Sequence, residues 1–169
     1  MIKKILLFFL KYLLIFGLAS FIGWLYEMIC VRIIYGQFYD RGILRIPICP
    51  IYGFGILVLI FIFQKIKNPF LLFVGSVFVT TVVELVTSYV LEYKFNLILW
   101  TYDGWPLSFQ DRISAVSSCI FGLMAVIFIK LIKPPVDKVF GSKYKTTAAL
   151  SVILLFVISI AGELWMRHS

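Results

Sequence analysis

Residues 69–92 read PFLLFVGSVFVTTVVELVTSYVLE. This stretch is long enough to cross a bilayer, which takes about 20 helical residues, and Asn68-Pro69 predicts a sharp break before it. Within it, polar residues recur at every fourth position and therefore share one helical face: Thr80, Glu84, Ser88 and Glu92. A helix surrounded only by lipid has no use for such a stripe. We therefore expect this face to turn toward other helices or a wet cavity.

The whole chain has the composition of an integral membrane protein. Of its 169 residues, 62% are hydrophobic and 14% are charged, whereas soluble domains are about 25% charged. The mean hydropathy is +1.04. The net charge of +8 comes from basic residues in short loops between apolar runs, where they act as topology signals and not as a nucleic-acid surface. The three cysteines lack metal-ligand spacing, so neither a metal nor a cofactor is expected.

The hydropathy pattern predicts an all-α fold, a polytopic membrane helical bundle of about five transmembrane helices in a single domain over 1–169. The predicted spans are 12–34, 50–66, 69–92, 113–133 and 147–166. The N-terminal run is too long for the core of a signal peptide, which indicates an uncleaved first span. Lys133-Pro134-Pro135 is expected to end the fourth span, because proline cannot continue a helix.

The distribution of basic residues predicts the orientation. Ten of the 16 basic residues, all lysines, fall on one side of the predicted bundle, which we place in the cytoplasm. The N-terminus is then inside and the C-terminus outside, in the cytoplasmic membrane. The connections 35–49 and 93–112, which are rich in aromatic and charged residues, share the outer side.

Two carboxylates inside apolar segments mark the candidate site. Glu27 and Glu84 each lie about 15 residues from the start of their spans, hence at similar depth. A carboxylate in hydrocarbon costs several kcal/mol unless it is paired, neutralised or wetted. Arginines of the outer connections are the expected partners, because a guanidinium pairs with a carboxylate in a planar fork. The expected site residues are Glu27, Arg41, Tyr52, Glu84, Ser88, Glu92, Tyr102 and Arg112. The alternative is a structural cluster that only holds the helices in register.

Small residues and prolines shape the expected surroundings of Glu27. Ala19 and Gly23 precede it at four-residue intervals, a spacing that permits close helix approach. In the segment IPICPIYGFG (46–55), two prolines predict an extended or kinked start to the second span, and the two glycines predict close backbone packing. Tyr52 lies at that bend.

Several motifs, taken in order, resemble the CmpB-type family of small membrane proteins, labelled ABC-transporter type IV permeases. The matching pieces are GWLYE (23–27), RG (41–42), PICPIYGFG (47–55), ELVTSYVLE (84–92), WTY (100–102), Pro106, Arg112-Ile113, Ser118 and Gly122. The resemblance covers about residues 15–135 and leaves out the fifth span.

The chain departs from the family pattern, W-D-Y-S…P-x-N-x-x-G-R, in one loop. Thr101 replaces the aspartate, Ser108 the asparagine, and Asp111 the glycine before the arginine. Phe121 stands where the family tends to have tryptophan. If this loop binds a ligand, these departures predict a changed specificity.

The resemblance implies a permease-like or transporter-associated protein that binds a small solute or a lipid headgroup in an outer-side polar pocket. The chain has no P-loop GxxxxGK[ST], so an ATP-driven role needs a separate ATPase, and few helices imply a homo-oligomer or a hetero-oligomer. An intramembrane enzyme acting on a lipid or lipid-linked substrate is one alternative, since paired carboxylates with arginine perform acid–base chemistry. A non-catalytic assembly or accessory protein is the other. Whether the chain is an enzyme stays open at this point.

Overall fold

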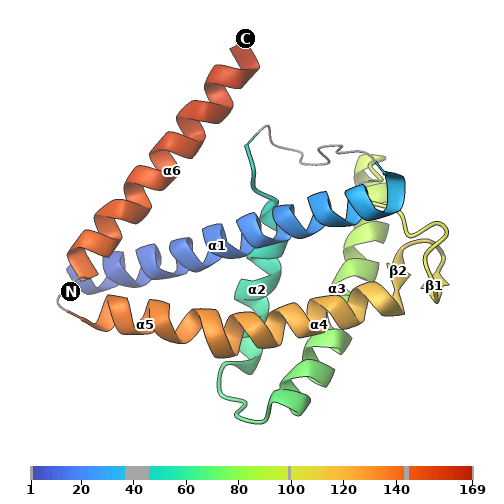
Figure 1. The fold of residues 1–169 in the computed structure, drawn as a ribbon, viewed down its shortest axis with the longest axis horizontal. Helices are drawn as coiled ribbons and strands as arrows, with labels where there is room; N and C mark the ends of the chain where they lie inside the picture. The colour runs from blue at the N-terminus through green and yellow to red at the C-terminus, as the bar shows by residue number, and fades with distance from the viewer. Residues whose placement is uncertain (1, 37–45, 99, 143–144, 169) are drawn as a thin grey trace. The chain divides into compact units, whose positions relative to one another are not determined.

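The structure, a computed structural model, describes residues 2–36, 46–98, 100–142 and 145–168, and most of them are helical (Figure 1). Their contacts divide the chain into two compact units. The first combines Met1–Val58 with Ile132–Ser169, and the second is Leu59–Leu131. That the chain forms a single domain stays a prediction.

The first unit is built on α1 (Ile2–Tyr35), which packs against α5 (Lys133–Gly141) and α6 (Lys145–His168) (Figure 1). The first residues of α2 (Pro50–Phe63) also belong to this unit. Its core contains Ile15 and Val152, which are almost fully buried. Asp137 of α5 forms an ion pair with Lys11 of α1, 3.0 Å away, and a second one with Lys133. These charges tie α5 to α1.

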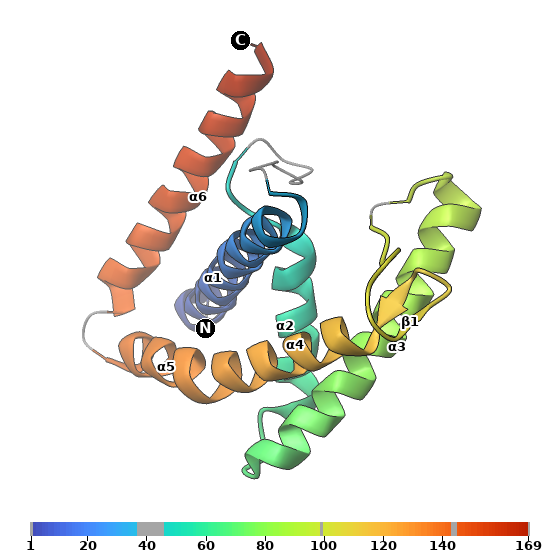
Figure 2. The same ribbon diagram turned by 45° about the vertical axis from the view of Figure 1, so that its right-hand side comes forward.

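The second unit is built on α3 (Pro69–Phe95) and α4 (Ala115–Ile127), which pack directly on each other. Gly122 makes this approach possible, because a Cβ there would lie 2.5 Å from Val77 Cγ2. The connection between the two helices contains a short antiparallel hairpin, β1 (Ser108–Phe109) and β2 (Ile113–Ser114) (Figure 2). This hairpin is the one sheet among the residues that the structure describes.

Local sequence explains both ends of α3. The Asn68 side chain accepts a hydrogen bond from the Phe70 N–H at 2.9 Å, and Pro69 occupies the first turn, where its missing N–H costs nothing. Asn96 ends the helix in the left-handed conformation with φ 52°. The predicted break at Asn68-Pro69 is therefore confirmed.

Three helical segments are long and apolar enough to cross a membrane: Ile2–Cys30, Pro69–Phe95 and Ala115–Gly141. Among the described residues, the apolar helices Pro50–Phe63 and Thr146–Ser159 are shorter. The chain is therefore a helical membrane protein, and the prediction of five spans is not confirmed. The helix in the second predicted span is shorter than predicted, because α2 ends at Phe63 and not at residue 66.

Other predicted boundaries differ as well. The first helix begins at Ile2 and not at residue 12, because Lys3 and Lys4 are good helix formers that do not interrupt the apolar run. The third continues to Phe95, and the fourth begins at Ala115 because the two residues before it form β2. The last helix, α6, is two residues longer at each end than the predicted 147–166.

The prediction that Lys133-Pro134-Pro135 ends the fourth span is wrong. Helical residues continue without a break to Gly141 through a π-helical turn, η1 (Phe128–Ile132). The two prolines then occupy the first turn of α5. A proline ring lacks the N–H donor and crowds the carbonyl one turn earlier. Both prolines fit here because the π-helical turn before them already departs from the regular ladder of hydrogen bonds.

Candidate functional site

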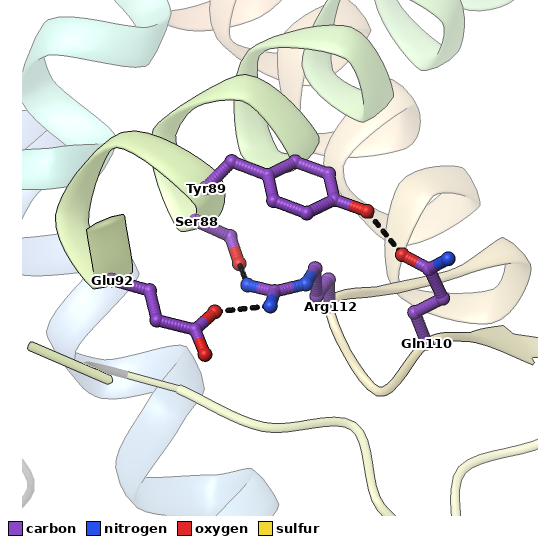
Figure 3. A network of polar contacts seen from close by, with 5 residues as sticks. All are labelled: Ser88, Tyr89, Glu92, Gln110 and Arg112. Atoms are coloured by element: carbon purple, nitrogen blue, oxygen red, sulfur yellow. Dashed lines mark hydrogen bonds and ion pairs between the residues drawn. The ribbon is translucent and has the colours of Figure 1, made fainter.

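The hairpin of the second unit presents Arg112 to the C-terminal end of α3. The Arg112 N–H donates to the carbonyl of Phe109 at 3.1 Å, which fixes the backbone at the turn. Its side chain reaches Ser88 and Glu92, one helical turn apart on one face of α3 (Figure 3). Arg112 Nη1 donates to Ser88 Oγ at 2.8 Å, and Nη2 forms an ion pair with Glu92. We call these three residues the Arg112 network.

Two further side chains surround the Arg112 network. The Tyr89 ring lies against the guanidinium, with 4.3 Å between the ring centroid and Arg112 Cζ, a cation–π geometry. The Tyr89 hydroxyl donates to Gln110 Oε1 (Figure 3). The hydrogen bond to Glu92 raises the pKa of Arg112 above its ordinary value, although partial desolvation opposes this effect. Arg112 is therefore a permanent cation at every physiological pH.

A cleft of about 240 Å³ opens beside the Arg112 network. Its lining combines helix, loop and hairpin: Ser88, Leu91, Glu92, Leu97, Ile98, Trp100, Thr101, Gln110, Asp111 and Arg112. The Trp100 Nε1–H donates to the carbonyl of Arg112 at 3.1 Å and holds the loop against the hairpin. The lining has one guanidinium and two carboxylates. Such a cleft suits a small polar group with an apolar neighbour.

Glu84 belongs to a second cluster, two turns earlier on α3. The Tyr102 hydroxyl donates to Glu84 Oε1 at 2.7 Å and lies 2.6 Å from Ser117 Oγ of α4. Tyr102 and Ser117 are buried, with 9% and 1% of their surface exposed. Glu84 Oε2 is also buried, and it accepts no hydrogen bond from any residue that the structure describes. We call Glu84, Tyr102 and Ser117 the Glu84 cluster.

Glu27 and Tyr52 lie together in the first unit. A Cβ on Gly23 would lie 2.1 Å from Tyr52 Cγ, so the predicted close approach at Gly23 is confirmed. One turn further along α1, Glu27 Oε1 accepts a hydrogen bond from the Cys49 thiol at 3.6 Å. A Cβ on Gly53 would likewise lie 2.4 Å from Ser20 Oγ. Gly55 has open space around it, so the expectation of close packing at Gly55 is wrong.

The structure thus distributes the predicted site residues over separate clusters. Ser88, Glu92 and Arg112 form one network, and Glu84 with Tyr102 forms a second one nearby on α3. Glu27 and Tyr52 belong to the first unit, and that they share a pocket with Glu84 stays a prediction. Arg41 lies outside the described residues.

The prediction of buried charges needs correction. Among the described residues no charged side chain is fully buried. Glu27, Glu84, Glu92 and Arg112 are all half-buried. Glu27 accepts from a thiol, Glu84 accepts from a hydroxyl, and Arg112 pairs with Glu92. A half-buried position also avoids the cost of full desolvation.

Sequence reasoning missed several residues of these clusters. Ser117 and Cys49 have no distinguishing signal in an apolar stretch, since small residues there usually serve packing. Tyr89 was not identified because it lies one position after Ser88, outside the four-residue spacing of the recognised polar positions of α3. Gln110 lies in the loop that the sequence shows to be rich in polar and aromatic residues, which was its one available signal. Trp100 had a second signal, because it belongs to the WTY motif.

The helices and the polar clusters together define a helical membrane protein with a partly hydrated site at one end of a span. The chain belongs to the family described as "Putative ABC-transporter type IV", which matches residues 14–164. The match extends beyond the expected 15–135 and includes most of α6. No curated protein and no solved structure matches the chain.

Proposed function

We propose that this chain is the membrane component of an ABC-type transporter and that the cleft beside the Arg112 network binds its solute or a lipid headgroup. The observation that carries the proposal is the position of Arg112. The residue belongs to the family motif, and it joins the hairpin to Ser88 and Glu92 at the wall of the cleft. A separate ATPase would supply the energy, because this chain has no P-loop.

The charge of the lining favours a particular class of ligand. Glu92 and Asp111 contribute two negative charges, and Arg112 contributes one positive charge. The Trp100 ring adds an aromatic wall. Carboxylates beside an aromatic ring are suited to an ammonium group. The expected ligand is therefore a small amine or zwitterion, free or as a lipid headgroup.

Two departures from the family pattern support a specificity role for this cleft. Thr101 and Asp111 replace an aspartate and a glycine of the pattern, and both line the cleft. Asp111 has φ 54°, a left-handed conformation that favours glycine. Relative to the pattern, the cleft thus loses a carboxylate at position 101 and gains one at position 111. The solute of this chain is thus expected to differ from that of relatives that follow the pattern.

A thermal-stability assay in nanodiscs tests the proposal, because a ligand that binds the native state raises its apparent stability. The probes are ethanolamine and glycerol phosphate in solution, and nanodiscs of phosphatidylethanolamine or phosphatidylglycerol. We expect the ammonium-bearing probes to raise the unfolding temperature of the wild type. Asp111→Asn should reduce this shift, whereas the same change at the exposed Asp103, outside the cleft, should preserve it.

The contrary outcomes identify the alternatives. Equal shifts for both variants, or no shift with any probe, would refute ligand binding at the cleft and favour a structural role. Copurification of an ATP-hydrolysing subunit with the wild type is the second expected result. Chemical turnover of a lipid probe, without such a subunit, would instead support the intramembrane enzyme.

A further inference from the structure

The carboxyl group of Glu84 occupies an unusual position for an acid. It lies on α3, which is apolar enough to cross a membrane, more than two turns from either end of the helix. One oxygen, Oε1, accepts a single hydrogen bond, from Tyr102. The other, Oε2, is buried and accepts no hydrogen bond from any described residue. An ionised carboxylate normally accepts several hydrogen bonds at once. The single hydrogen bond found here is far fewer than the charged form needs to offset its burial.

The charges around Glu84 offer no compensation within the described part of the second unit. The loop contributes Tyr102 and α4 contributes Ser117, neither of which carries a charge. On α3 itself, the neighbours one turn away are Thr80, whose hydroxyl bonds backbone carbonyls, and Ser88, which bonds Arg112. The Arg112 guanidinium reaches as far as Ser88, one turn from Glu84, but its ion pair is with Glu92, which lies eight residues or about 12 Å from Glu84 along the helix.

A proton fits this site better than a metal ion does. No three His, Cys, Asp or Glu side chains gather into a metal-binding group in the described residues. A single carboxylate with two hydroxyls would coordinate Mg²⁺ or Ca²⁺ poorly, since these ions take six or more oxygen ligands. One proton neutralises the carboxylate without any further ligand.

The hydroxyls of the Glu84 cluster can respond to that proton without moving. Tyr102 has one hydroxyl proton and two oxygen neighbours, at 2.7 Å and 2.6 Å. With Glu84 ionised, Tyr102 donates to Glu84 and accepts from Ser117. With Glu84 protonated, the carboxyl group donates to Tyr102, which then donates to Ser117. Each state forms both hydrogen bonds, so the cluster accommodates either charge.

We propose that Glu84, Tyr102 and Ser117 form a reversible proton-binding site, separate from the cleft. The site lies next to the cleft, because the Tyr102 N–H donates to the carbonyl of Asp111 at 2.8 Å. Asp111 lines the cleft and precedes Arg112. This inference does not depend on the identity of the solute.

Infrared spectroscopy of the full chain in nanodiscs, recorded over a range of pH, tests this proposal. The carbonyl band of a protonated carboxyl group reports the bound proton. In the wild type we expect one such band to disappear as the pH rises. It should be lost in Glu84→Gln and retained in Glu92→Gln, the matched change at an acid outside the cluster.

A second variant keeps the test decisive if Glu84→Gln does not fold. In Tyr102→Phe the carboxyl group loses its hydroxyl partner, so the band should remain but move to higher frequency. Ser117→Ala should give a smaller shift in the same direction. The proposal fails if no band differs between the wild type and Glu84→Gln, if the Glu84 band is independent of pH, or if Tyr102→Phe leaves its frequency unchanged.

Discussion

Replacing Tyr102 by phenylalanine removes one oxygen atom and with it both hydrogen bonds of the Glu84 cluster. In Tyr102→Phe, Glu84 Oε1 and the buried Ser117 hydroxyl each lose a partner, at 2.7 Å and 2.6 Å in the wild type. Hydrogen bonds inside membrane proteins contribute about 0.6–2 kcal/mol each, similar to those of a water-soluble protein, because the unfolded chain in lipid also finds partners. The free energy of unfolding should therefore fall by about 1–3 kcal/mol.

Tyr93→Phe provides the matched control, since it removes the same hydroxyl from a side chain that is 79% exposed. Its expected effect lies within about 0.5 kcal/mol. Reversible unfolding in mixed micelles with increasing detergent denaturant measures both variants against the wild type. If the two variants lie within about 0.5 kcal/mol of each other, the hydroxyl of Tyr102 contributes no net stability and the reasoning is wrong.

Four further substitutions test other parts of the structure. Gly23→Ala should lower the free energy of unfolding by about 1–3 kcal/mol, because the added Cβ overlaps the Tyr52 ring. In the same unfolding assay Gly55→Ala, with open space around it, should be neutral or raise the free energy of unfolding by up to about 1 kcal/mol. Asn68→Ala removes the cap of α3 and should cost about 1 kcal/mol, and no loss would show that Pro69 alone fixes the start of the helix. Arg112→Lys cannot reproduce the planar two-pronged contact with Ser88 and Glu92. It should therefore lower the unfolding temperature and reduce the stabilisation by ammonium-bearing probes. An unchanged stabilisation would show that Arg112 takes no part in binding these probes.

Local chemistry made part of this molecule predictable. Asn68-Pro69 starts α3 because the cap and the proline act within one turn, and that information lies entirely in neighbouring residues. The four-residue spacing of the α3 stripe placed Ser88 and Glu92 on one face, where the structure finds them sharing Arg112. Gly23 was likewise recognisable, because small residues at that spacing are typical of close helix contacts.

The remaining features depend on contacts between distant residues. Tyr102 meets Glu84 from 18 residues further along the chain, and Ser117 meets Tyr102 from 15 residues beyond that. No local pattern specifies these contacts. The continuation of the helix past Pro134 requires a π-helical turn before it, whereas proline by itself indicates a stop. The length of apolar runs identified membrane segments, but it could not show that the helical part of the second run ends after 14 residues.

The backbone of the hairpin loop has a consequence for biogenesis. Leu107, Gln110 and Asp111 all adopt left-handed conformations, with φ between 52° and 54°. Such conformations cost non-glycine residues roughly 1 kcal/mol or more each, so the isolated loop does not favour this shape. Contacts with α3 and α4 must hold it, which means that both helices have to be inserted and packed first. During synthesis the loop is accordingly expected to reach this shape only once α3 and α4 are packed, so the cleft that it lines should form no earlier than the contact between these helices.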